Sequence, residues 1–392
     1  MDRLRLLTVG PVDVGDDTLG ALAQPTLPHY GPPWRPVYDS TLELLARLFR
    51  TSNDILLMPG PGSGALDTGI GSLIPPHSSI CVPANGFFGE RIQQIVEAYD
   101  IQACVIDFPP GQPIDPETLR QKLAAWIPQC AAEGRPMQAM ALAHHETSTG
   151  ILNPLREIAQ VAHEFDLVLI VDAVASMGGV PLPVDEWGID VCVSVPNKCL
   201  SAPPGVAMMS VSPRGWELAN ANPARHGWYH DLRTWAWFRE HEREWHPYPT
   251  TLPTNVIVAL NHALTKLFEE GADQRIAHIR GTAMHVREGM NELGFQMFPH
   301  PDYAAPVLSA FHAYPDSNVS DMMRFLREEH NLMISGGLGD LAGKLFRIGH
   351  MGAAATPAIT ETLLAALTEY LATRGLNGKH GRTEAKNQLR QA

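Results

Sequence analysis

The segment DLVLIVDAVAS, residues 166–176, decides the fold class of this chain. It is a nearly unbroken run of Val, Ile and Leu, and a strand that is apolar on both faces is typical of a parallel sheet covered by helices. Runs of the same kind recur along the chain, and we predict further strands at 54–59, 78–84, 137–145, 190–196 and 206–212. Helical patterns lie between them, at 65–74, 116–127 and 154–165. This alternation predicts an α/β fold with a mainly parallel central sheet and helices on both of its faces.

The length of 392 residues is too great for one compact core and favours two domains. We expect a large domain with an N-terminal arm over residues 1–272, because a helical pattern at 254–271 ends at a glycine. A smaller C-terminal α+β domain is expected over residues 273–375, followed by a polar, loosely held tail at 376–392. The segment 225–250 is aromatic and polar without a clear period, and we interpret it as an excursion across the site or a subunit boundary.

Composition excludes several classes of function. The formal net charge is −13, and without a basic patch we expect no binding to nucleic acid. The first residues contain no apolar run long enough for a signal peptide or a membrane span. The five cysteines are scattered without a CxxC pair, and the seventeen histidines are dispersed without an HExxH motif. We therefore expect no disulfide framework and no metal site, and a reduced, cytoplasmic protein.

Chemically versatile residues lie at the ends of the predicted strands. They are the loop GPGSG (60–64), the loop HETSTG (145–150), Asp172 and Lys198. In an open parallel sheet, ligands bind outside the carboxyl ends of the strands. One ligand could therefore contact all four groups.

Each of these groups also has a simpler interpretation. A glycine-rich loop at a helix N-terminus can cradle an anion, or it can be only a tight turn; without a following GK[ST] it is not a Walker loop. The buried carboxylate of Asp172 needs a donor or cationic partner, or it caps a helix. Lys198, in SVPNKCLSAPPG, is either a desolvated nucleophile or a surface lysine.

Taken together, the four groups form the set that a pyridoxal phosphate site requires. The lysine forms a Schiff base, the aspartate keeps the ring nitrogen protonated so that the ring draws electrons, and the helix N-terminus takes the phosphate. Lys198 follows Asp172 by about one strand–helix–strand unit, which can bring both side chains to the same edge of the sheet.

Several motifs resemble those of the class V aminotransferases of fold type I, in the alanine–glyoxylate and serine–glyoxylate branch. The similarity extends over nearly the whole chain to about residue 375. The motifs are TVGPVDV near the start, ANGFFGER (84–91), HHETSTGILNP (144–154), the segment from VDAVAS to SAPPG (171–205) and FRIGHMG (346–352).

The resemblance implies a role for individual residues of this sequence. Lys198 is similar to the catalytic Schiff-base lysine, Asp172 to the partner of the ring nitrogen, and Arg347 to the arginine that binds the substrate carboxylate. Tyr30, in LPHYGPPWRPVYD (27–39), is expected to face the substrate. The other residues implied to bind pyridoxal 5'-phosphate are Gly62, Ser63, Phe88, Thr147 or Ser148, Val174 and Asn197, together with Tyr248 and Thr251 from a partner subunit.

The implied reaction is ping-pong transfer of an amino group from alanine or serine to glyoxylate or pyruvate. The implied assembly is a homodimer with shared active sites. Two related activities stay open, namely pyridoxamine–pyruvate and ureidoglycine–glyoxylate aminotransferase. The former resembles this chain at HHETSTG and PNKCL but implies an acidic residue in the cradle, where this sequence has Pro61.

Three other classes of function have their own sequence requirements. A desulfurase or lyase on the same fold is one of them, and Asn197 argues against desulfuration, because it stands where the cysteine desulfurases of the same superfamily carry a histidine. A nicotinamide-dependent enzyme requires an acidic residue about 20 positions after the glycines, and residues 81–85 contain none. A non-catalytic binding protein on this fold is expected to lack the lysine or the aspartate, and both are present.

Overall fold

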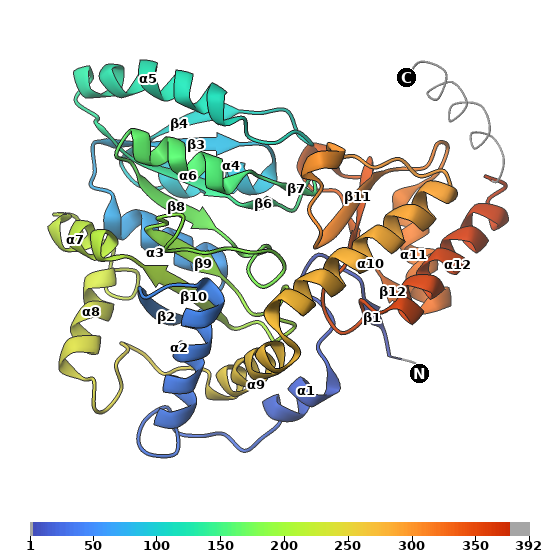
Figure 1. The fold of residues 1–392 in the computed structure, drawn as a ribbon, viewed down its shortest axis with the longest axis horizontal. Helices are drawn as coiled ribbons and strands as arrows, with labels where there is room; N and C mark the ends of the chain where they lie inside the picture. The colour runs from blue at the N-terminus through green and yellow to red at the C-terminus, as the bar shows by residue number, and fades with distance from the viewer. Residues whose placement is uncertain (1–2, 377–392) are drawn as a thin grey trace.

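A seven-stranded sheet organises the larger part of the chain in the computed structural model, which describes residues 3–376 (Figure 1). Residues 377–392 of the predicted polar tail lie outside the described residues. The strand order is β2-β10-β9-β8-β5-β3-β4. The strands are β2 (Asp54–Pro59), β3 (Ser78–Ala84), β4 (Ile101–Asp107), β5 (Met137–Ala143), β8 (Val168–Asp172), β9 (Val191–Ser194) and β10 (Val206–Val211).

The prediction of a mainly parallel sheet is confirmed, with one reversed strand. β10 runs antiparallel to both β2 and β9, whereas the other neighbouring strands are parallel. The reversal follows from the short connection between β9 and β10, because a parallel neighbour requires a crossover of a dozen or more residues. Residues 195–205, which contain the lysine, form this connection.

Helices cover the strands, and most of the strand residues are buried. Helices α3 and α4 pack together against the sheet, as do α5 and α6. Helix α8 (Leu232–His241) lies in the segment for which no period was predicted. Its apolar residues do not form one stripe, since Trp235 is buried while Trp237 is exposed. The remaining helices of this part are α1 (Asp16–Leu22), α2 (Arg35–Phe49), α3 (Gly62–Leu73), α4 (Phe87–Glu97), α5 (Pro116–Ala132), α6 (Leu155–Glu164), α7 (Pro213–Ala221) and α9 (Thr254–Glu270).

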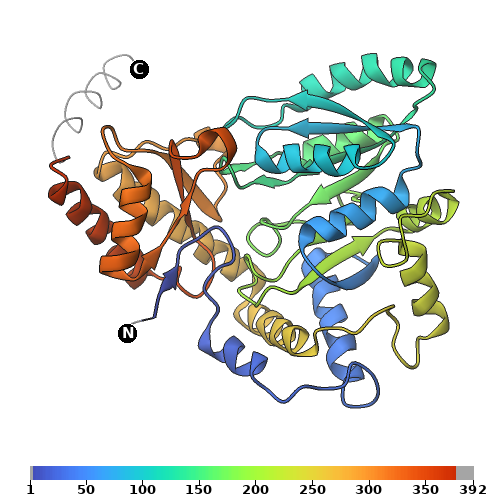
Figure 2. The same ribbon diagram turned by 180° about the vertical axis from the view of Figure 1, so that it is seen from behind.

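A smaller unit follows α9 and has its own apolar core. Its three-stranded sheet, in the order β11-β14-β13, packs beside long helices, as the view from behind shows (Figure 2). The elements are α10 (Ala272–Glu292), β11 (Leu308–His312), α11 (Val319–His330), β12 (Leu332–Met333), β13 (Ser335–Gly336), β14 (Leu345–Gly349) and α12 (Pro357–Thr373). The division of the chain at residue 272 stays a prediction.

The N-terminal segment joins the two units. Its strand β1 (Arg5–Leu6) pairs with β12 of the small unit, and the side chain of Leu7 belongs to that unit's core. Helix α1 then packs against α9 of the large unit. No helix among the described residues combines the length and the apolar composition needed to cross a membrane.

Candidate active site

Asp172 and Lys198 lie at the same edge of the large sheet. Asp172 is the last residue of β8 and pairs in register with Val193 of the parallel strand β9. Lys198 follows shortly after β9 ends at Ser194. The neighbouring strands therefore deliver a carboxylate and an amine to one place, as expected for the carboxyl ends of parallel strands.

Burial changes the protonation of both groups in opposite directions. It raises the pKa of Asp172 to about 6, an effect that the Val174 amide opposes. Burial lowers the pKa of the Lys198 amine to about 8, and the negative charge of Asp172 partly offsets that effect. An amine with a pKa close to neutrality can both accept and donate a proton near physiological pH.

Gly62 lets the N-terminus of α3 pack against the residues that directly follow β8 and β9. A Cβ atom at Gly62 would lie 2.7 Å from Cγ2 of Val174 and 3.2 Å from Cγ1 of Val195. The absence of a side chain therefore lets the helix begin directly beside the ends of β8 and β9. Backbone N–H groups and Ser63 lie in the first turn of α3, where an anion is stabilised.

The buried carboxylate of Glu146 holds two loops of the site together. Its Oε2 accepts hydrogen bonds from the backbone N–H groups of Phe88, at 3.0 Å, and Gly89, at 3.1 Å, in the first turn of α4. Its Oε1 accepts from the backbone N–H and the hydroxyl of Ser148. The Ser148 hydroxyl in turn accepts from the N–H of Phe87 at 3.1 Å. Phe88 and the loop 147–149 are thus fixed relative to each other.

Thr147 and Ser148 differ in what their hydroxyls can still do. The Ser148 hydroxyl is used within the loop, as described above. The Thr147 hydroxyl makes no hydrogen bond within the described part of the chain, although the residue is buried. Thr147 is therefore the better candidate for contact with a ligand.

Arg347 of β14 approaches the same loop from the small unit. Its Nη1 donates to the Thr147 carbonyl at 2.9 Å and its Nε donates to the Gly336 carbonyl at 2.8 Å. The side chain is only 4% exposed, and burial lowers its pKa to about 10. Among the described residues no carboxylate lies within ion-pair distance of this guanidinium. A buried, unpaired cation is suited to bind an anionic group.

Tyr30, predicted to face the substrate, and the two residues predicted to serve a partner subunit lie apart from this cluster. Tyr30 is 43% exposed, and its ring packs against Trp245. Thr251 is exposed. Tyr248 is only 1% exposed; its hydroxyl donates to the His29 carbonyl and accepts from the Trp34 indole at 2.7 Å. Figure 1 draws the loop before α2, which carries Tyr30, at the lower edge of the molecule, away from the junction of the two units.

His144 and His145, which precede Glu146, each form a hydrogen bond to another group of the protein through one ring nitrogen. Nδ1 of His144 lies 3.0 Å from the Ser176 hydroxyl, and Nδ1 of His145 lies 3.3 Å from the Ala175 carbonyl. Burial lowers the pKa of both imidazoles to about 3, so both are neutral at physiological pH. The described residues contain no group of three or more side chains arranged to hold a metal ion.

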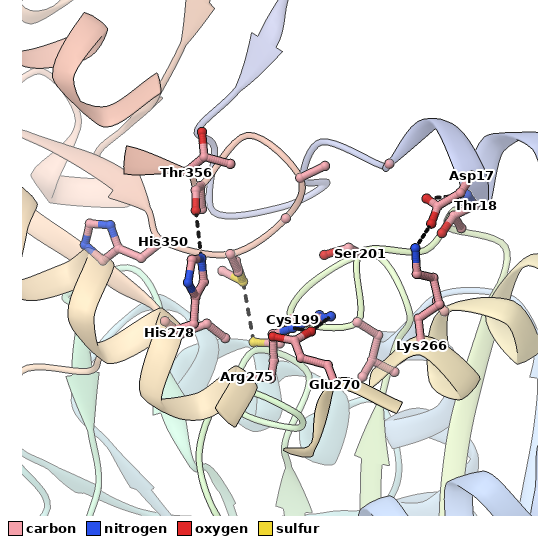
Figure 3. A pocket seen from close by; sticks show the side chains of 18 residues that line it. Asp17, Thr18, Cys199, Ser201, Lys266, Glu270, Arg275, His278, His350 and Thr356 are labelled. Atoms are coloured by element: carbon pink, nitrogen blue, oxygen red, sulfur yellow. Dashed lines mark hydrogen bonds and ion pairs between the residues drawn. The ribbon is translucent and has the colours of Figure 1, made fainter. Parts of the chain in front are cut away.

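A cavity of about 290 Å³ is lined by Cys199, the residue that follows Lys198 in the chain, and by residues of both units. Figure 3 shows that its charged side chains point at one another: Lys266 bonds to Asp17, and Arg275 bonds to Glu270. Because these cations are already neutralised, the cavity offers no free charge to an anionic ligand. It adjoins the site without supplying groups to it.

Two contributions to the site were not foreseen from the sequence. Glu146 was noted only as part of a polar loop, and nothing in the linear sequence indicates that it bonds to α4. The Val9 carbonyl, which accepts a hydrogen bond from Lys198 Nζ at 2.5 Å, lies in the quoted motif TVGPVDV. The motif indicated that this region is important, but it did not predict that the Val9 carbonyl contacts the lysine.

Comparison with known proteins identifies the family. Residues 90–344 match the family model described as aminotransferase class-V. An uncharacterized aminotransferase of Methanocaldococcus jannaschii is 34% identical over 91% of this chain and 90% of its own length. The pyridoxamine–pyruvate transaminase of Mesorhizobium japonicum is 30% identical over 93% and 91%.

Solved structures give the same result. A ureidoglycine–glyoxylate aminotransferase from Bacillus subtilis superposes with a TM-score of 0.89, at 26% identity, over 97% of this chain and 96% of its own. An alanine–glyoxylate aminotransferase from Nostoc sp. superposes with a TM-score of 0.87, at 29% identity, over 94% and 95%. The fold is thus that of the fold type I transferases. The chain belongs to the class V aminotransferase family and is a transaminase.

The hydrogen bonds of Glu146 predict that this residue stabilises the fold. We expect Glu146→Ala to lower the free energy of unfolding by about 3 kcal/mol or more, because several buried donors lose their acceptor together. Glu157→Ala is the matched control, since Glu157 is exposed in the first turn of α6. Chemical denaturation of both variants measures the difference. Equal stabilities would show that the Glu146 contacts do not hold the loops.

Proposed function

We propose that this protein is a pyridoxal phosphate-dependent aminotransferase that moves an amino group between small amino acids and small 2-oxo acids. The observation that carries the proposal is the meeting of three groups: the Lys198 amine, the Asp172 carboxyl and the unpaired guanidinium of Arg347. Alanine or serine is the proposed donor, and glyoxylate or pyruvate the proposed acceptor.

The residues present fit the proposed cofactor. The raised pKa of Asp172 marks a carboxylate that lacks sufficient cationic stabilisation, and a protonated ring nitrogen would supply it. Phe88 is proposed to stack on one face of the ring and Val174 to pack on the other. Thr147 offers a free hydroxyl, and the first turn of α3, with Gly62 and Ser63, offers N–H groups to a phosphate. Asn197 is proposed as a further phosphate contact.

Bound pyridoxal phosphate would supply a carbonyl that condenses with amines and a ring that draws electrons from the neighbouring carbon. The protein's own residues supply the rest. Lys198 Nζ takes the proton from the substrate α-carbon and would deliver it to the cofactor carbon that is bonded to the transferred nitrogen, which its pKa of about 8 permits near neutral pH. Asp172 keeps the ring nitrogen protonated, and Arg347 orients the substrate through its carboxylate.

The loop at the start of α3 bears on the choice among related activities. Pro61 precedes the helix and Gly62 begins it, and residues 60–64 contain no acidic side chain. A cradle of N–H groups without a carboxylate supports a phosphate rather than an unphosphorylated ring. Turnover of pyridoxamine with pyruvate, or of ureidoglycine with glyoxylate, is the result that would reassign the substrate within the family.

We propose that the active protein is a homodimer with shared sites. Large aromatic side chains are exposed in the segments 27–39 and 228–248, with Trp228 at 57% and Trp245 at 55%. Exposed aromatic patches of this kind mark interfaces. Thr251 lies on the surface beside them and is proposed to reach the partner's phosphate. Tyr248 could join it only by leaving its contacts with His29 and Trp34. All five cysteines are free thiols, which fits the proposed cytoplasmic location.

The proposed role of Lys198 predicts a specific loss. With pyridoxal phosphate added, the wild-type protein should show the visible absorption of a lysine-bound cofactor, and L-alanine or L-serine should remove it. Lys198→Ala should bind the cofactor only non-covalently and lose turnover, because no other lysine of residues 3–376 lies at that point. Lys122→Ala, an exposed lysine of α5, should behave as wild type. Near-normal transamination by Lys198→Ala would remove this lysine from the mechanism.

The proposed role of Arg347 predicts a loss of substrate affinity. Arg347→Ala should raise KM for the amino and 2-oxo acids roughly 10- to 100-fold, the loss expected for a charge-assisted contact. Arg280→Ala, on the exposed side of α10, is the control. Steady-state kinetics with both substrates measure the change. An unchanged KM would mean that the carboxylate is held elsewhere.

The proposed dimer predicts a sedimentation mass of twice the chain mass of 42.9 kDa. Trp245→Glu should shift the protein toward the monomer, because it places a charge in an aromatic contact. Met284→Glu changes an equally exposed apolar residue on α10 and should leave the mass unchanged. A wild-type protein that sediments as a monomer at micromolar concentration would refute shared sites.

A further inference from the structure

The N-terminal segment lies between the small unit and the lysine. On the side of the small unit, the Leu7 carbonyl accepts a hydrogen bond from the Gly349 N–H at 2.8 Å. The Val9 N–H donates to the Ser335 hydroxyl at 3.2 Å. These contacts, together with the pairing of β1 with β12, attach the segment firmly to the small unit.

The same segment touches Lys198 with its opposite side. The Val9 carbonyl accepts a hydrogen bond from Lys198 Nζ at 2.5 Å. A Cβ atom at Gly10 would lie 2.4 Å from Cδ, Cε and Nζ of the lysine, and Gly10 has a φ of +121°. Only glycine satisfies both the backbone conformation and the close approach. The lysine therefore rests directly on the backbone of residues 9 and 10.

Strand β13 connects Val9, whose carbonyl contacts Lys198, to Arg347, the proposed substrate-binding arginine. Ser335 receives the Val9 N–H, and the next residue, Gly336, accepts from Nε of Arg347 at 2.8 Å. Two adjacent residues of one short strand thus hold both the N-terminal segment and the guanidinium. The path from Arg347 to Lys198 consists of three hydrogen bonds, joined covalently through Gly336 and Ser335 and through Val9.

We propose that the Val9 carbonyl is the resting partner of the Lys198 amine whenever that amine is free, and that Ser335 fixes the carbonyl in place. Lys198 and Arg347 are then held as one hydrogen-bonded unit across the boundary between the two units. Val9, Gly10 and Ser335 are positioning residues in this arrangement. The inference rests on the proposed function, in which the lysine amine is alternately bound and free.

A carbonyl is suited to this task because it only accepts hydrogen bonds. It can take one N–H of a neutral amine and leave the nitrogen lone pair available to receive a proton. It also stabilises the ammonium form, since a hydrogen bond to a charged donor is the stronger one. The charged and titratable groups that act on the amine are Asp172 of β8, Arg347 of β14 and the adjacent Cys199. His145 of the short strand β6 (His145–Glu146) lies nearby.

The test measures the pKa of the Lys198 amine in the full chain loaded with pyridoxamine 5'-phosphate, in which the lysine is free. Competitive acetylation across a pH range, read by mass spectrometry of the Lys198 peptide, gives this pKa. Gly10→Ala should displace the amine from the Val9 carbonyl and lower its pKa below that of the wild-type protein. Ser335→Ala should lower it in the same direction but less, because it only loosens Val9.

The control is Gly20→Ala in α1, where an added Cβ meets no atom within 4 Å, and its pKa should equal that of wild type. A fall of about 0.5 in the pKa of Lys198 would raise the neutral fraction of its amine near pH 7 roughly two- to threefold. The acetylation rate should rise by a similar factor. Ser335→Ala is small enough to keep the fold if Gly10→Ala does not, so the test remains decisive.

An unchanged or raised pKa in Ser335→Ala, and in Gly10→Ala where it folds, overturns the proposal even if the melting temperature falls. A purely structural role would lower stability without moving the pKa of Lys198. The measurement involves no turnover and can be repeated without added cofactor. A failure of the proposed transamination would therefore be detected separately, in the kinetics, and the pKa measurement could still be interpreted.

Discussion

Burial of opposite charges at the ends of β8 and β9 is the constraint on which the site depends. Each pKa unit by which burial moves a group corresponds to about 1.4 kcal/mol, and both Asp172 and Lys198 are moved by burial against their charged forms. The fold tolerates this cost because the strands that deliver the two groups are apolar along their length and tightly packed. The same cost is what makes the amine reactive, since a fully hydrated lysine would stay protonated.

The loops around this pair are ordered by backbone hydrogen bonds rather than by side-chain packing alone. Glu146 joins the start of α4 to the turn at Ser148, and Arg347 then bonds to the Thr147 carbonyl of that turn. The face of Phe88, the hydroxyl of Thr147 and the guanidinium therefore share one set of supports. A change in any one of these supports is therefore expected to alter all three groups.

The sequence predicted the strands of the large sheet well because their signal is local. The runs at 54–59 and 78–84 match β2 and β3 residue for residue, and the ends of two such runs led directly to Asp172 and Lys198. Contacts between distant positions left no local signal. Val9 and Lys198 are 189 residues apart, and the bonding of Glu146 to α4 depends on how two loops meet. Tyr248 was identified by the family resemblance alone, and a resemblance does not show that its hydroxyl is already hydrogen-bonded within its own chain.

Division of the site between two units has a physical consequence for selectivity. The lysine and the aspartate belong to the large sheet, whereas the arginine belongs to β14 of the small one, so the distance between amine and carboxylate positions depends on how the units sit together. A substrate with additional carbons between its amine and its carboxylate would have to separate them. The N-terminal segment opposes that separation, because it is bonded to β12, β13 and β14 on one side and to Lys198 and Asn197 on the other. The relative position of Lys198 and Arg347 is therefore held by backbone contacts. If Arg347 binds the substrate carboxylate as proposed, these contacts favour substrates in which an amine and a carboxylate share one carbon.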